Sequence, residues 1–207
     1  MAQDLADIIS IDNGNTAVEI KDSAFEIGKV LFNFIKRGPD GKHPDFKIQI
    51  YMDIPEFLLF SQSVKNHLFL KKNEKIKTNF LATGGCGFPA ATKEFLGGTS
   101  KASLAAKGRT RPDKMSESRV LKLFPATKSK INHVILQAEC GGGEEANTGI
   151  IIPRMNYTSK DPNIFRRIQV GTSYQTLESA CLMVESRYNG YIASQYVKDA
   201  FKFKKEN

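Results

Sequence analysis

The feature that most constrains the fold of this chain is a strand-and-helix pattern that occurs twice, about 120 residues apart. In the first half, Lys47-Ile48-Gln49-Ile50 alternates polar and apolar residues with the period of a strand, and Arg167-Ile168-Gln169-Val170 repeats this alternation in the second half. Each run precedes a sequence that predicts a capped helix, Asp53-Ile54-Pro55-Glu56 in one half and Thr172-Ser173-Tyr174-Gln175 in the other. The pattern therefore indicates a duplicated unit.

Further strand-like runs lie upstream of both predicted helices. Turn chemistry is expected between strands at Gly38-Pro39-Asp40-Gly41 and at Cys140-Gly141-Gly142-Gly143, because glycine accepts positive φ angles and proline fixes an extended start. The sequence thus predicts an α+β fold of two ββββα-type units, each an antiparallel sheet followed by a helix. The other expected strands are 5–11, 16–20 or 24–27, and 30–36 in the first half, with 119–124, 132–139 and 149–154 in the second.

The 207 residues are predicted to form a single domain, since a chain of this length can bury a substantial core. No apolar run approaches the roughly 20 residues that cross a bilayer, and the first residues lack the features of a secretory signal, so a cytoplasmic location without membrane contact is expected. The predicted parts of the domain are a first unit at 5–70, a basic Gly-rich connecting loop at 71–116, a second unit at 117–200 and a basic tail at 201–207.

Positive charge is concentrated between Lys93 and Lys130. This segment holds ten Lys or Arg against three acids, a net +7 within a whole-chain formal charge of +8. A local excess of one sign attracts a polyanion, and nucleic-acid phosphates are the usual one. The segment therefore favours nucleic-acid binding, with a solvated linker as the alternative interpretation.

Four strands followed by a helix, present twice in one chain, resemble the Whirly and PC4-like single-stranded DNA-binding fold. The resemblance is one of element order and covers roughly residues 5–70 and 117–200. The stretch Ser100–Gly108 is similar in composition to the short Lys-Gly-Lys-Ala-type motif of the Whirly family, although here it lies between the two halves. The resemblance implies a basic, aromatic-bearing sheet face, helices that pack two units together, self-association and a preference for DNA over RNA.

Single-strand binders combine cations that follow the backbone with flat side chains on which bases stack. The aromatic candidates here are Phe34, Tyr51 and Phe124, and core packing is the alternative role for each. The cations predicted to contact phosphates are Lys36, Lys47, Lys101, Lys107, Arg109, Arg111, Lys114, Arg119, Lys122 and Arg167.

The leading hypothesis is a non-enzymatic, sequence-tolerant single-stranded nucleic-acid binder that forms homo-oligomers and needs no cofactor, metal or small-molecule substrate. Such a protein suits an accessory role in a bacterial mobile element or phage. One alternative is an assembly protein whose basic segment docks an acidic partner. The other is a metal-dependent nuclease, because Glu139, Glu144 and Glu145 bracket the glycines at 141–143 and carboxylates are ligands for divalent cations.

Overall fold

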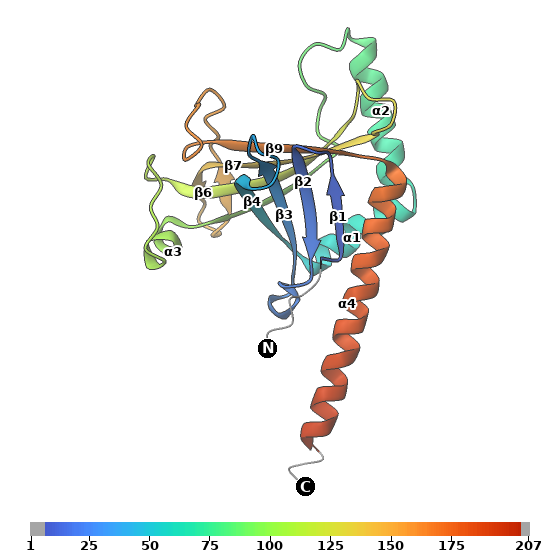
Figure 1. Ribbon diagram of the computed structural model, residues 1–207, viewed down its shortest axis with the longest axis vertical. Coiled ribbons are helices and arrows are strands. Elements are labelled where there is room, and N and C mark those ends of the chain that lie inside the picture. The colour runs from blue at the N-terminus through green and yellow to red at the C-terminus, as the bar shows by residue number, and fades with distance from the viewer. Residues whose placement is uncertain (1–6, 204–207) are drawn as a thin grey trace.

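The computed structural model describes residues 7–203, with side chains described as far as Lys198, and its strands form two antiparallel sheets. Figure 1 shows the strands of the first sheet crossing those of the second. The first sheet follows the chain order and contains β1 (Ile9–Asp12), β2 (Thr16–Lys21), β3 (Lys29–Arg37) and β4 (Pro44–Asp53).

The second sheet has five strands, with β7 at its centre. Strand β6 pairs with one side of β7, while β9 and β8 pair with successive parts of the other side, and β5 forms an edge next to β6. These strands are β5 (Lys93–Thr99), β6 (Ser116–Pro125), β7 (Val134–Glu145), β8 (Ile151–Pro153) and β9 (Arg166–Thr172).

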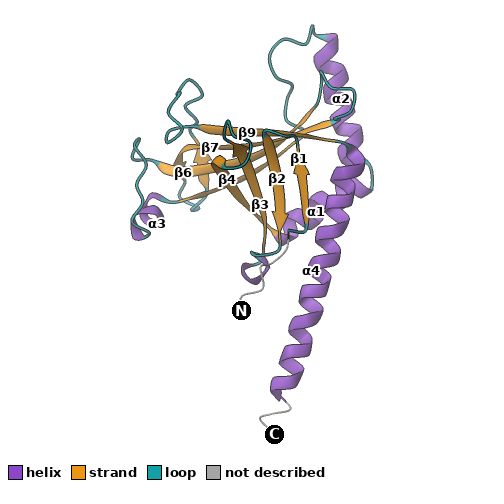
Figure 2. Ribbon diagram, viewed as in Figure 1, coloured by secondary structure: helices purple, strands orange, loops and turns teal. Residues whose placement is uncertain are grey.

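The three longest helices follow one or the other sheet in the chain, and Figure 2 shows the helices in purple. Helix α1 directly follows β4, and α4 follows β9, so each sheet is followed in the chain by a helix. The two helices pack together, and Lys65 Nζ of α1 lies 2.7 Å from Glu185 Oε2 of α4. The helices are the 3-10 turn η1 (Phe25–Ile27), α1 (Ile54–Lys65), α2 (Leu68–Ala82), α3 (Lys101–Ala106) and α4 (Tyr174–Phe203).

A single hydrophobic core joins the two halves. The predicted alternation in β4 holds, since Ile48 and Ile50 are buried while Lys47 and Gln49 are exposed. The inner faces of the sheets and the inner faces of α1 and α4 contribute to the same cluster. Its members include Val18, Phe32, Phe34, Ile48, Ile50, Phe57, Phe95, Leu121, Leu136, Ile168, Val170, Cys181 and Val184.

The segment 71–116 differs from the connecting loop that the sequence predicted. It contains most of α2, the whole of β5 and the short helix α3. Strand β5 forms because seven consecutive residues pair with β6, from Lys93 opposite Leu123 to Thr99 opposite Glu117. Pairing with a strand that is distant in the sequence therefore orders a Gly-containing stretch whose local sequence favours a loop.

The glycines at 141–143 also differ from the prediction, because they lie inside β7 and not in a turn. A Cβ atom on Gly141 would lie 2.5 Å from Met155 Sδ, and one on Gly142 would lie 2.8 Å from Met115 Sδ. At Gly143 a Cβ would lie 2.5 Å from Ile151 Cγ2 and 2.9 Å from Ser118 Cβ, so the glycines accommodate closely packed neighbours while the strand continues through them. The expected turn at Gly38–Gly41 does connect β3 with β4.

The helix caps are simpler than the predicted capping boxes. Asp53 precedes α1, but its side chain makes no capping hydrogen bond and instead accepts one from Lys29 Nζ at 2.5 Å. At α4 the capping residue is Ser173, whose Oγ accepts the N–H of Thr176 at 3.1 Å.

No helix within the described residues has the length and apolar character needed to cross a membrane.

Candidate nucleic-acid interface

A polar groove of about 520 Å³ lies between β4 of the first sheet and β5 and β6 of the second. It brings together residues from five separate stretches of the chain, and its volume falls within the roughly 300–1,000 Å³ typical of ligand sites. We call it the β4–β5 groove. Its lining consists of Ile27, Lys29, Gln49, Ile50, Tyr51, Asp53, Leu96, Gly97, Gly98, Thr99, Lys107, Arg109 and Arg119.

Two guanidinium groups in the β4–β5 groove are oriented by one buried carboxylate. Glu117, whose side chain is 3% exposed, bonds Arg119 through one oxygen and lies 3.5 Å from Arg109 Nη2 through the other. Arg119 is thereby held in place, while Arg109 keeps more than half of its side chain in solvent. Two cations facing one acid leave a net positive charge at this wall, to which Lys107 adds.

Tyr51 supplies an aromatic ring at the opposite wall of the groove. It is 38% exposed and shares the outer face of β4 with Gln49 and Lys47, because alternate strand residues point to the same side. Lys47 lies two residues before Gln49, on the same face of β4, and is exposed. The outer face of β4 therefore presents an ammonium, an amide and a phenol ring in a row.

Four predicted site residues thus line the groove, namely Tyr51, Lys107, Arg109 and Arg119, and Lys47 extends it. Lys101 and Lys114 are exposed beside α3, where they line an adjoining cavity of about 360 Å³ that also includes Arg109. Figure 2 shows α3 flanked by loops, at the end of the molecule opposite α2. Lys101, Lys107 and Lys114 therefore gather around Arg109, whereas the exposed Lys93, Lys128 and Lys130 of the basic segment line neither cavity.

Arg111 has a different place from the one predicted. Its side chain is 6% exposed, bonds both carboxylate oxygens of Asp113 at 3.1 and 2.7 Å, and donates to the carbonyl of Ile164 at 2.8 Å. These contacts tie the loop before β6 to the loop before β9. Arg111 is a structural residue of the folded chain, because its donors are already used internally.

Lys122 and Arg167 form a second cluster on the outer face of the second sheet. Both bond Glu139, which is fully buried, with Lys122 Nζ at 3.0 Å and Arg167 Nη2 at 2.9 Å. Burial works against the charged form of Lys122, but the hydrogen bond and negative charge of Glu139 outweigh it and raise the pKa of Lys122. The guanidinium of Arg167 also lies 5.4 Å from the ring centre of Tyr157.

Three further predicted residues lie away from the groove. Phe34 has no exposed surface and belongs to the core, so the prediction that it stacks on a base is wrong for the folded chain. Lys36 is half-buried at the end of β3, opposite Phe46 of β4. Phe124 is half-buried and lies opposite Ile135 on the outer face of the second sheet.

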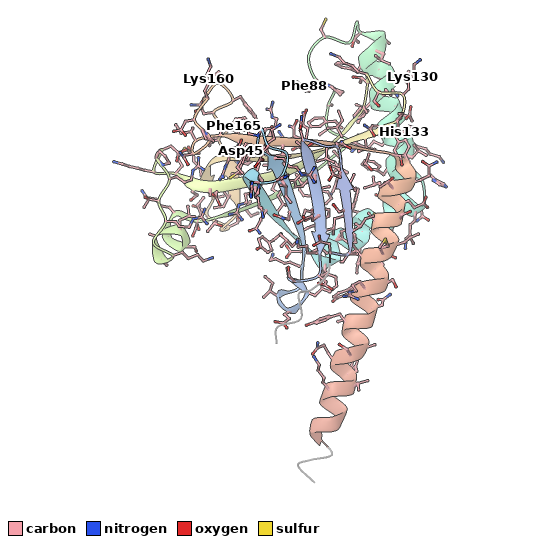
Figure 3. The ribbon with its side chains drawn as sticks, in the orientation of Figure 1. Asp45, Phe88, Lys130, His133, Lys160 and Phe165 are labelled. Carbon is pink, nitrogen blue, oxygen red and sulfur yellow. The ribbon has the colours of Figure 1, made fainter. Side chains whose placement is uncertain are left out.

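Sequence reasoning missed several residues of these two surfaces. Lys29 and Gln49 line the groove, and Tyr157 and Phe165 form an edge-to-face pair 5.2 Å apart against Arg167. Figure 3 shows Phe165 among the side chains above the strands of the second sheet. The segment between β8 and β9 has no periodicity that would predict where its aromatic rings lie.

The acids of the nuclease alternative do not form a metal site in this structure. Both carboxylate oxygens of Glu139 form ion pairs, with Lys122 and with Arg167. Glu144 is exposed and accepts a hydrogen bond from Arg154 Nε at 2.9 Å. Within the described part of the chain, no three or more His, Cys, Asp or Glu residues are grouped so that they could hold a metal ion.

Comparisons of this chain with protein-family models, with curated proteins and with solved structures find no match.

Proposed function

We propose that this chain binds single-stranded nucleic acid in the β4–β5 groove without strict sequence preference. The observation that supports this most is the convergence of Lys107, Arg109 and Arg119 opposite the exposed ring of Tyr51. Cations neutralise phosphates, and a flat ring accepts any base, so this pair of walls suits a flexible polyphosphate strand.

The order of the elements supports a related proposal, that the fold is Whirly or PC4-like. Strands β1 to β4 are followed by α1, and β5, β6, β7 and β9 are followed by α4, so a ββββα-like order occurs twice once α2, α3 and the short β8 are counted as additions. DNA is the preferred ligand through this resemblance alone, and RNA suits the groove equally in charge and stacking. The groove's cations also suit an acidic protein partner, but such a partner gives no role to Tyr51.

The first experiment measures binding of labelled single-stranded DNA, duplex DNA and single-stranded RNA by fluorescence anisotropy over a range of salt concentrations. Each phosphate contact on a single strand contributes about 0.7 to the slope of log affinity against log salt. The double variant Lys107→Ala/Arg109→Ala should therefore bind all sequences more weakly and lower the slope by about 1.4. The matched control is Lys128→Ala/Lys130→Ala, because both lysines are exposed and Lys130 lies near α2, far from α3 (Figure 3).

Equal loss of affinity in the groove variant and the control would mean that general charge, and not the groove, attracts the strand.

Substitutions of Tyr51 test the other wall of the groove. Stacking is worth about 1–3 kcal/mol per base, so Tyr51→Ala should weaken binding roughly 5- to 150-fold, while Tyr51→Phe keeps the ring and the affinity. An absence of binding to every nucleic acid at low salt would reject the proposed function.

A further inference from the structure

The cavity of about 360 Å³ that adjoins the β4–β5 groove lies between α3 and the loop that leads to β6. We call it the α3 cavity. Its volume is near the lower end of the roughly 300–1,000 Å³ typical of ligand sites, which suits a single ring system. Its lining consists of Lys101, Leu104, Ala105, Arg109, Thr110, Arg111, Pro112, Lys114 and Met115.

The walls of the α3 cavity are largely apolar. Leu104 is buried, Met115 is half-buried, and Ala105 and Pro112 are exposed. Apolar surface that faces water gains free energy when a flat apolar face covers it. Among the lining residues, Thr110 has the one uncharged polar side chain, so the cavity has little means to distinguish one ring from another by hydrogen bonds.

Exposed cations accompany these apolar walls. Lys101, Arg109 and Lys114 are exposed, and none of the described residues that line the cavity is acidic. Two acids nearby in the chain, Asp113 and Glu117, already pair with arginines. The α3 cavity therefore combines an apolar surface with an excess of positive charge.

The loop wall of the α3 cavity is held in one conformation by its own hydrogen bonds. The Lys114 N–H donates to the Arg111 carbonyl at 3.0 Å, and the Met115 N–H donates to Asp113 Oδ1 at 3.1 Å. Lys114 has a φ of 57°, so a cation lines the cavity at a position where the backbone favours glycine or asparagine. Strained residues of this kind cluster at binding sites, and a wall that is fixed before binding lowers the cost of ordering.

The chemistry of the lining favours a nucleic-acid strand over a peptide. Lysine and arginine side chains donate hydrogen bonds and accept none, whereas phosphate oxygens accept and do not donate. A peptide strand brings N–H donors for which these side chains have no acceptor. Arg109 lines both the β4–β5 groove and the α3 cavity, so a strand bound in the groove reaches the cavity along a continuous line of cations.

We propose that the α3 cavity receives one unstacked base of the strand that the β4–β5 groove binds, an inference that rests on the proposed function. Arg109 then neutralises a phosphate between the groove and the cavity, while Lys101 and Lys114 neutralise phosphates beside the inserted base. The apolar walls accept any base, so the cavity adds affinity for bases without adding a strict sequence preference.

Two labelled strands of equal length, oligothymidylate and a strand made only of abasic sites, test this inference by fluorescence anisotropy. Ala105→Leu fills the cavity without a change of charge. It should weaken thymidylate binding roughly 5- to 150-fold, as for the loss of one stacked base, and leave abasic binding and the salt slope unchanged. The matched control is Ala106→Leu, because Ala106 is the next residue of α3, is exposed and does not line the cavity.

A second variant, Thr110→Leu, fills the cavity from the loop wall and gives the same test if Ala105→Leu fails to fold. Tyr51→Ala should keep part of the preference for thymidylate over the abasic strand, and the addition of Ala105→Leu should lower that preference further.

The outcomes separate this inference from the proposed function. Filled-cavity variants that bind thymidylate as tightly as Ala106→Leu would overturn the inference alone, because loss of binding in Lys107→Ala/Arg109→Ala would still support the groove. Equal affinity of the wild type for the two strands would also overturn it. A wild type that binds neither strand at low salt would reject the proposed function, and the inference with it.

Discussion

At the level of single residues, buried carboxylates determine which cations remain available to a ligand. Four of the ten basic residues between Lys93 and Lys130 bond Asp113, Glu117 or Glu139, and the side chains of the last two acids are at most 3% exposed. The sequence revealed the excess of charge correctly but could not show these pairings, because Glu139 lies 17 residues beyond Lys122 and meets it only through the register of β6 and β7.

Replacement of Arg111 should therefore lower the stability of the fold, whereas replacement of Arg109 should not. Arg111→Ala removes a partner from Asp113 and from the Ile164 carbonyl, so we expect a loss of about 1–3 kcal/mol in the free energy of unfolding at neutral pH. Arg109→Ala should leave stability nearly unchanged, since its side chain is 56% exposed. Urea denaturation of both variants checks this, and equal losses would contradict the structural assignment of Arg111.

The same pair predicts a dependence on pH. Burial raises the pKa of Asp113, but the hydrogen bonds from Arg111 and from the Met115 N–H, together with the charge of Arg111, outweigh it and hold the pKa below the ordinary 3.8. A carboxyl whose pKa is lowered by folding stabilises the fold above its unfolded pKa and loses that contribution as the pH falls. The stability difference between wild type and Arg111→Ala should therefore shrink as the pH falls below about 5 and through the lowered pKa of Asp113. A constant difference would argue against this coupling.

At the level of elements, the strands with clear alternation were predicted well and those fixed by distant contacts were not. The expected strands near 30–36, 47–52 and 119–124 correspond to β3, β4 and β6, whose inner residues fill the core. Helix α2 gives a weak signal, since Phe69 and Asn73 are its buried residues and the rest of its surface is polar or exposed. The β4–β5 groove could be predicted in part, from Tyr51 and the basic segment, but its shape depends on β5.

Asn73 is the residue that holds α2 against the second sheet. Its amide nitrogen donates to Tyr174 Oη at 2.5 Å and to the His133 carbonyl at 3.2 Å, and its amide oxygen accepts from Thr92 Oγ1 at 2.5 Å. Burial raises the pKa of Tyr174 to about 12, so this hydroxyl stays protonated at neutral pH.

Replacement of Asn73 by Ala should cost about 1–3 kcal/mol, because it leaves buried hydrogen-bonding groups without partners. The measurement is the urea midpoint, with hydrogen exchange over residues 68–99 to localise the effect. Thr83→Ala is the control, since Thr83 lies at the exposed end of α2 and should change the midpoint little. A midpoint for Asn73→Ala that equals the control would show that α2 is held by its apolar contacts instead.

At the level of the whole molecule, the continuous core predicts that the two halves unfold together. Ile50 of β4 and Leu123 of β6 belong to the same buried cluster, although they come from different sheets. Ile50→Ala should cost about 2–5 kcal/mol, the usual range for removing a large buried side chain. If the core is one cooperative unit, this loss should accelerate hydrogen exchange in β6 and β7 as much as in β3 and β4, and Leu123→Ala should do the same in reverse. Leu59→Ala is the control, because Leu59 is 69% exposed on α1. Faster exchange confined to the mutated half would mean that the two halves are separately stable, and that the groove between them can open without global unfolding.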